Sequence, residues 1–293
     1  MPGGARAALI AACVLWAVSF VATKVALDAA PPLVVVTLRL VISAVCFAPW
    51  IATPGDLGSL GGRRGLVRLF WLSLIGTGLH YGLQTVGLQY TTASNASLYA
   101  ITAPITILLL SAMILGERIT LRKALGVALA LAGVLMVMGP GTLTTLELGA
   151  HVKGDFLVLV SIVLWGLFTV LGKAATDELG ALRLTAWVTL IGALWMLPVG
   201  AYEMHATGFA VASMTLEAWM AVGFLGVGCS FLATLLYFVA LERTESQKVG
   251  VYLYTIPPMT AVVAVFYLGE TLSANLVVGA VLVIAGVALT ERG

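Results

Sequence analysis

The sequence predicts an all-α polytopic membrane protein whose ten transmembrane helices form two inverted repeats of five helices each. Three observations lead to this fold class. Hydrophobic residues make up 61% of the 293 residues and charged residues only 10%, whereas a soluble domain is about 25% charged. The chain contains ten apolar stretches of roughly the 20 residues that cross a bilayer. A set of marker residues also occurs once in each half of the chain.

The duplication is clearest in the fourth predicted helix of each half. Its markers are Tyr99, Pro104 and the Leu-Gly-Glu sequence at 115–117, which recur 153 positions later as Tyr252, Pro257 and Leu-Gly-Glu at 268–270. A proline inside each apolar stretch removes a helical hydrogen bond and predicts a kink. Kinked or broken helices at corresponding positions of two repeats are typical of transporters that bind a substrate between the repeats.

The predicted helices account for most of the chain. They cover residues 7–28, 33–52, 67–90, 94–115, 121–139, 155–176, 182–202, 217–241, 247–268 and 273–290. An odd number of helices per repeat makes the two copies cross the membrane in opposite directions. We therefore expect a first repeat at 1–140, a linker at 141–153 and a second repeat at 154–293. The first helix matches a segment in mid-chain, so we expect it to be retained rather than cleaved as a signal peptide.

The basic residues predict the orientation of these helices. Twelve of the 15 Lys and Arg residues flank one set of helix ends, Lys24 and Lys153 flank the other set, and Arg39 lies inside a helix. Because basic residues accumulate on the cytoplasmic side, we expect a multi-pass protein of a bacterial-type inner membrane with both termini in the cytoplasm. The net charge of +2 and the absence of a long basic run predict no nucleic-acid partner.

Several classes of function lack their motifs in this sequence. There is no phosphate-binding loop, nucleophile elbow or HExxH motif, and none of the 13 acidic residues lies in the middle of a predicted helix. Cys13, Cys46 and Cys229 follow no metal-binding or disulfide spacing. We therefore expect no enzyme activity, catalytic residue, cofactor or metal. The expected partners are a small-molecule substrate and lipid, with the protein a monomer or a homodimer.

Polar side chains inside apolar helices indicate where a substrate could bind, because they are costly in the membrane. His80, Tyr81 and Gln84 gather in the third helix, and Ser230 and Tyr237 occupy its repeat counterpart. Tyr99 and Tyr252 lie on hydroxyl-bearing faces of the fourth and ninth helices. Two interpretations remain open. These groups either form hydrogen bonds between helices of a solid bundle or line a central cavity.

Large aromatic residues lie near the middle of the first helix of each repeat rather than at its ends. These are Trp16 with Phe20 and Trp165 with Phe168. Core packing is one interpretation, and a pocket that stacks on a flat or cationic ligand is the other. Arg39 lies inside the second helix. It either extends toward the membrane surface and pairs with Asp28, or faces a cavity and attracts a carboxylate.

The two five-helix halves, the Leu-Trp pair followed by Lys24 or Lys173, the paired prolines and the Leu-Gly-Glu sequences together resemble the EamA-like drug/metabolite transporters. Within them, His80, Tyr81 and Gln84 with the mid-helix tryptophans resemble the YddG-type aromatic amino-acid exporters. The resemblance implies alternating access around a central site. We expect an exporter of amino acids, aromatic ones first, and of related small molecules. The alternatives are a general metabolite or drug exporter, and a membrane scaffold or receptor that transports nothing.

Overall fold

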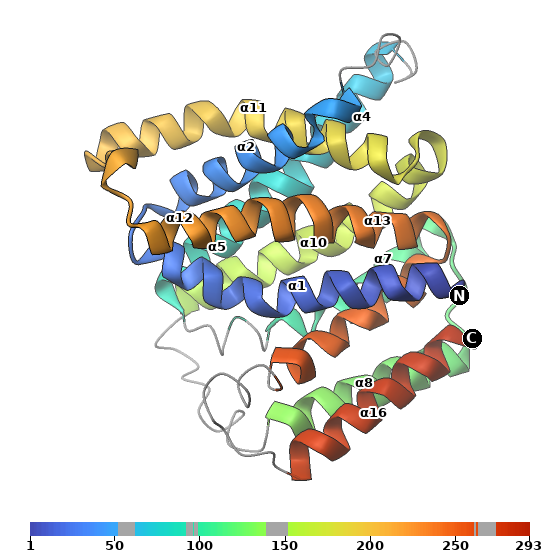
Figure 1. The fold of residues 1–293 in the computed structure, drawn as a ribbon. Helices are drawn as coiled ribbons and strands as arrows, with labels where there is room; N and C mark the ends of the chain where they lie inside the picture. The colour runs from blue at the N-terminus through green and yellow to red at the C-terminus, as the bar shows by residue number, and fades with distance from the viewer. Residues whose placement is uncertain (52–61, 92–95, 97–98, 139–151, 261, 263–273) are drawn as a thin grey trace.

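The computed structural model describes residues 1–51, 62–91, 96, 99–138, 152–260, 262 and 274–293, and this part of the chain is helical without any β-strand (Figure 1). The elements of the first half are α1 (Gly3–Leu27), α2 (Pro32–Ile51), α4 (Gly62–Ser73), η1 (Leu74–Leu79), α5 (His80–Tyr90), α7 (Ala103–Leu115) and α8 (Leu121–Met138). Those of the second half are α10 (Val152–Leu179), α11 (Ala181–Thr207), η2 (Val211–Ser213), α12 (Leu216–Gly223), η3 (Phe224–Ala233), α13 (Thr234–Glu242), α14 (Ser246–Gly250), η4 (Val251–Thr255) and α16 (Ala274–Glu291).

Eight apolar helices among the described residues are long enough to cross a membrane, and α7 is a shorter ninth. The α4–η1–α5 and α12–η3–α13 segments each form one continuous crossing. The predicted ninth helix, 247–268, is described only as far as 260 and at 262, and most of the predicted linker lies outside the described residues. The prediction of an all-α polytopic membrane protein is confirmed, and the number of crossings is consistent with ten.

The repeat-related helices α8 and α16 pack against each other in opposite directions (Figure 1). Gly126 of α8 lies against Gly286 of α16, and Gly133 lies against Gly279. Gly279 and Gly286 are the repeat counterparts of Gly126 and Gly133. Each of the two contacts is therefore the repeat counterpart of the other, with the two helices exchanged. Such reciprocal contacts are the signature of a two-fold axis. The glycine faces of α8 and α16 are therefore occupied by contacts within the chain.

The lysine that follows the Leu-Trp pair has the same structural role in both repeats. Lys24 of α1 donates to the carbonyl oxygens of Leu88 and Thr91, where α5 ends. Lys173 of α10 donates to the carbonyl of Glu242, where α13 ends. Carbonyl groups in the last turn of a helix lack partners inside the helix and favour a nearby cation. Each lysine thus ties the first helix of its repeat to the third.

Local departures from α-helical geometry also occur in pairs. The third crossing of each repeat contains a π-helical segment, η1 in the first and η3 in the second, and such wide turns often mark functional sites. The fourth crossing of each repeat is interrupted just before its proline. A turn precedes α7, where Pro104 lies in the first turn, and the 3₁₀ segment η4 precedes Pro257. A break in a helix changes the direction in which the side chains before and after it point.

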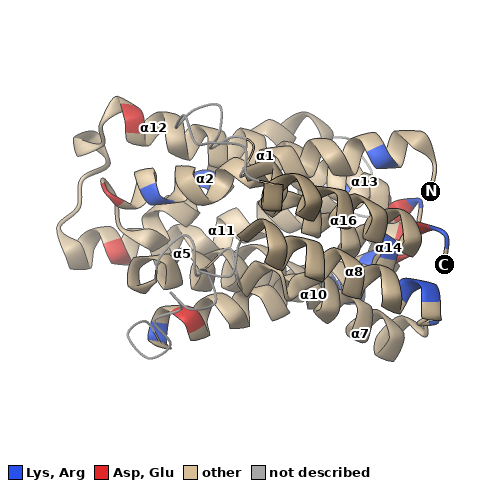
Figure 2. Ribbon diagram, turned by 90° about the horizontal axis from the view of Figure 1, so that it is seen from below, with Lys and Arg blue, Asp and Glu red and all other residues tan. Residues whose placement is uncertain are grey.

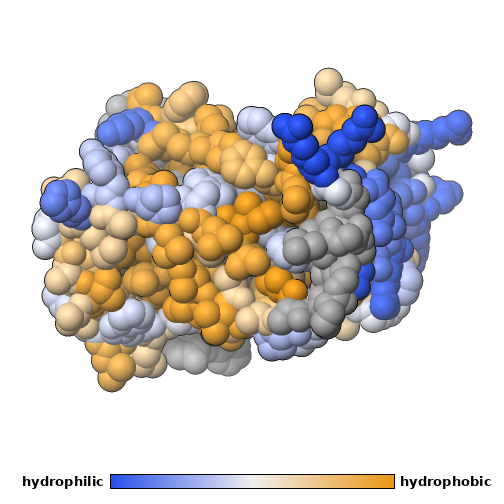
Figure 3. Space-filling view, turned by 90° about the horizontal axis from the view of Figure 1, so that it is seen from above, coloured by the Kyte–Doolittle hydropathy of each residue, from blue (hydrophilic) through white to orange (hydrophobic). Residues whose placement is uncertain are grey.

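Both termini lie at one end of the bundle, which we call the termini end, and the opposite end is called the far end (Figure 1). Lys and Arg residues gather at the termini end, and the middle of the bundle is nearly free of charge (Figure 2). Hydrophobic side chains cover much of the surface between the two ends (Figure 3). Exposed Val45, Leu194 and Val281 are examples from three different helices. An apolar belt bounded by polar ends is the surface expected for a protein surrounded by lipid.

Candidate functional site

A cavity of about 480 Å³ lies between the two repeats. It occupies the half of the bundle toward the far end, since α1 contributes residues from its second half and α8 contributes its last two residues. Its described lining consists of Trp16, Ser19, Phe20, Val21, Arg39, His80, Tyr81, Gln84, Ala100, Ile101, Ala103, Val137, Met138, Ile162, Trp165, Leu253, Ile256, Pro257 and Thr260. The lining is mainly apolar with a few polar groups, as in pockets for small molecules.

Arg39 contributes a buried cation to the cavity wall, with only 3% of the residue exposed. Its Nε donates to Ser230 Oγ at 2.9 Å, and its guanidinium carbon lies 4.1 Å from the centre of the Tyr81 ring. The structure records no ion pair of Arg39 with a carboxylate among the described residues, and Asp28 is not its partner. Arg39 therefore lies at the cavity wall, and its attraction for a carboxylate stays a prediction.

His80 begins α5 directly after the π-helical segment η1. Its Nδ1 lies 2.8 Å from the carbonyl oxygen of Ser161. A carbonyl only accepts hydrogen bonds, so Nδ1 carries a proton, and in the neutral imidazole Nε2 is then left as an acceptor. The imidazole packs between Tyr81 and Trp165, with ring centres 4.9 and 5.1 Å away. His80 therefore presents an oriented ring to the cavity that Gln84, one helical turn later, also lines.

Aromatic rings from both repeats meet at the cavity wall. Trp16 and Trp165 contact each other edge to face, with ring centres 5.3 Å apart. Tyr237 lies behind them, 5.3 Å from Trp16 and 5.4 Å from Trp165, and its hydroxyl is 3.2 Å from Thr169 Oγ1. Phe168 backs Trp165 at 5.7 Å without lining the cavity. The repeat-related tryptophans thus form one connected aromatic surface.

The remaining predicted site residues are placed elsewhere. Tyr99 lies within hydrogen-bonding reach of Asp155, and the Tyr252 hydroxyl donates to Glu291 near the termini end. Ser230 reaches the cavity only through Arg39, whereas Pro104 follows the lining residue Ala103. Sequence reasoning did not find the lining residues Ser19, Val21, Ala100, Ile101, Ala103, Val137, Met138, Ile162, Leu253, Ile256 and Thr260. Most of them are apolar, and composition does not separate a cavity wall from a lipid-facing surface.

Comparison with known proteins yields one family and several full-length relatives. The EamA-like transporter family matches residues 5–139 and again residues 152–292. An uncharacterized transporter of Archaeoglobus fulgidus is 31% identical over 276 residues, covering 94% of this chain and 93% of that protein. A protein of Streptantibioticus cattleyicolor named "Probable terminal-alkyne amino-acid exporter" is 31% identical over 289 residues, covering 97% and 92%. A crystal structure shares the fold with a TM-score of 0.80 at 20% identity, over 100% of this chain and 99% of the other.

Proposed function

Because the chain belongs to the EamA-like transporter family, we propose that it exports amino acids, aromatic ones first, by alternating access around the cavity beside Arg39. The observation that carries this proposal is the buried guanidinium at the cavity wall. A buried cation costs free energy unless an anion or hydrogen bonds compensate it. The α-carboxylate of an amino acid supplies that anion and can accept two parallel hydrogen bonds from a guanidinium.

The rest of the lining matches the other parts of an amino acid. A neutral His80 offers Nε2 as an acceptor, because Nδ1 donates to the Ser161 carbonyl, and an ammonium group is a donor. Gln84 adds a side-chain amide carbonyl one turn away. Trp16, Trp165 and Phe20 offer apolar faces for a flat side chain, and aromatic faces also attract cations. The substrate would bind with its carboxylate toward Arg39 and its side chain along the tryptophans.

The alternatives fit less well. A general metabolite or drug exporter would also have to accept cationic substrates, which the Arg39 guanidinium at the cavity wall repels. The relatives are transporters rather than enzymes, and they do not support a scaffold or receptor. The relative from Streptantibioticus cattleyicolor is named as an amino-acid exporter, which supports the proposed class of substrate.

The aromatic preference predicts a selective effect of Trp16→Ala. We expect purified protein in liposomes to transport phenylalanine and tryptophan, and Trp16→Ala to weaken both by about tenfold while alanine and valine change little, because stacking and ring burial are lost. Trp219→Ala is the matched control, since Trp219 lies on α12 outside the cavity lining and is partly exposed. Labelled amino acids report uptake. Equal losses for aromatic and aliphatic substrates would contradict the aromatic preference.

We further propose that the termini end faces the cytoplasm of a bacterial-type inner membrane, because the basic residues gather there (Figure 2). In a background without native cysteines, Arg64→Cys at the termini end and Ser213→Cys at the far end are both exposed. We expect an impermeant maleimide added to intact cells to label the cysteine at 213 and not the one at 64. The reverse pattern would invert the proposed orientation.

A further inference from the structure

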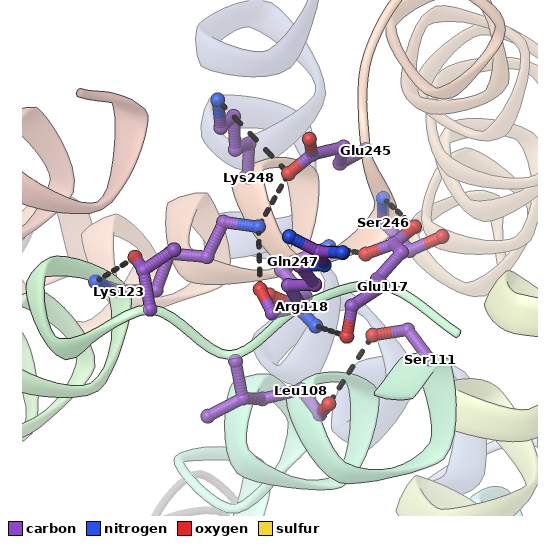
Figure 4. Close-up of polar contacts among 10 residues, drawn as sticks. Leu108, Ser111, Glu117, Arg118, Lys123, Glu245, Ser246, Gln247 and Lys248 are labelled. Carbon is purple, nitrogen blue, oxygen red and sulfur yellow. Dashed lines mark hydrogen bonds and ion pairs between the residues drawn. The ribbon is translucent and has the colours of Figure 1, made fainter. Parts of the chain in front are cut away.

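The two repeats are joined at the termini end by Glu117, which follows the left-handed Gly116 at the end of α7. Figure 4 shows its carboxylate facing the start of α14. Oε1 accepts the backbone N–H of Ser246 at 2.8 Å, and Oε2 accepts that of Gln247 at 3.1 Å. The Gln247 amide also donates to the carbonyl oxygen of Glu117 at 3.3 Å. Carboxylate hydrogen bonds to N–H groups at a helix start are strong ones.

A second contact between the repeats lies beside the first. Lys123, at the start of α8 and only 2% exposed, donates to Glu245 Oε2 at 2.5 Å and to the carbonyl of Arg118 at 3.0 Å. Burial alone would raise the pKa of the Glu245 carboxyl, but the hydrogen bond and charge of Lys123, with Lys248 nearby, hold this pKa below its usual value. Glu245 therefore stays ionised at neutral pH, and the ion pair persists.

Two buried polar atoms in this contact between the repeats lack a hydrogen-bond partner among the described residues. They are Ser246 Oγ and Gln247 Oε1. Buried polar atoms without partners are rare because each one loses its hydration. This loss offsets part of the gain from the Glu117 and Lys123 contacts. This contact between the repeats is therefore held by a few specific bonds rather than by a fully complementary interface.

The position of these contacts relative to the cavity indicates what they do. The cavity lies toward the far end. The bonds of Glu117 to Ser246 and of Lys123 to Glu245 (Figure 4) instead join the repeats at the starts of α14 and α8, at the termini end (Figure 2). A transporter must close one side of its site while the other side is accessible. We propose that the bonds of Glu117 and Lys123 to the Glu245–Gln247 segment form a latch that closes the site from the termini end, and that the latch must release before substrate can enter from that end. This inference rests on the proposed transport function.

A cysteine behind the latch tests the inference without measuring transport. Ser111, in the last turns of α7, lies beside Glu117 and is 0% exposed (Figure 4). In a background with the three native cysteines replaced by alanine, Ser111→Cys reports access to water. We expect Glu117→Gln, which keeps the size of the side chain and loses its charge, to make maleimide labelling at 111 about tenfold faster, since an open state that becomes tenfold more populated reacts tenfold faster. With Glu117→Asp, labelling at 111 should be faster than in the unaltered protein and slower than with Glu117→Gln.

Two controls separate release of the latch from general loosening. Asp177→Asn also removes a carboxylate at the termini end, but Asp177 pairs with Lys173 within one helix, so labelling at 111 should not change. Ser43→Cys places a second reporter in α2, which packs against α11 and η3, and its labelling should stay slow in every variant. Unchanged labelling at 111 in Glu117→Gln, or equal acceleration at 43, would overturn the latch. If the unaltered protein did not transport amino acids in liposomes, the proposed function would be refuted instead.

Discussion

Replacing Arg39 with glutamine is expected to reduce the kcat/KM for amino-acid transport by about 100-fold, which corresponds to roughly 2.7 kcal/mol. The guanidinium is buried at the cavity wall without a carboxylate partner among the described residues. Hydrogen bonds to charged groups contribute about 1.5 to 3 kcal/mol, and a substrate carboxylate would lose such a bond. Glutamine keeps much of the volume, and its amide can still donate to Ser230 Oγ, so the fold should survive the change.

Two comparisons assign the loss to charge recognition. Arg39→Lys retains the charge but not the planar pair of donors, so its activity should lie between the glutamine variant and the unaltered protein. Phenethylamine is phenylalanine without its carboxylate, and whatever weak binding it shows should not fall in the Arg39 variants. Stabilisation of the purified protein against heat by added ligand gives the affinities, and liposome uptake gives the rates. Normal phenylalanine transport by Arg39→Gln would show that the carboxylate binds elsewhere.

The sequence predicted those features of the site that depend on a polar or bulky side chain in an apolar setting. Arg39, His80 and Gln84 were visible because such groups are costly in a membrane helix, and the structure brings them to one cavity with Trp16. The π-helical segments η1 and η3, which present His80 and Ser230, had no signal in the sequence. Their backbone geometry depends on contacts with other helices. One example is the packing of Phe168 against Gly76.

Tyr252 shows why a repeat in the sequence does not predict equivalent positions for its two copies. Tyr99 and Tyr252 are repeat counterparts, yet neither lines the cavity, and Tyr252 donates to Glu291 near the termini end. The cavity lies toward one end only, so the two copies have different surroundings in this conformation.

The sequence did not predict the latch, for a different reason. Its acceptor, Glu117, belongs to a conspicuous motif, but its donors are backbone N–H groups of Ser246 and Gln247, which every residue type except proline supplies.

The two-fold packing of α8 and α16 leads to the largest expected effect on stability. A Cβ atom added at Gly286 would lie 2.5 Å from both the Ala130 nitrogen and the Gly126 oxygen, and these are backbone atoms. Backbone cannot rotate away as a side chain does, so Gly286→Ala must push the two helices apart. Overpacking of a close interface costs about 1 to 3 kcal/mol, and occasionally more. We expect a value at the top of this range.

A second glycine in the α8–α16 contact tests the same expectation, and a glycine outside it serves as a control that should not lose stability. Gly133 is the counterpart of Gly286, and a Cβ there would lie 2.6 Å from the Gly279 oxygen, so Gly133→Ala should destabilise the protein by a similar amount. Gly223 ends α12 with nothing within 4 Å of an added Cβ. Gly223→Ala should therefore be neutral or stabilise by up to about 1 kcal/mol, because alanine favours the helix. Thermal unfolding in detergent measures all three variants. If Gly133→Ala and Gly286→Ala were as stable as Gly223→Ala, the α8–α16 contact would not be the close glycine packing described, and the two-fold arrangement would lose its main support.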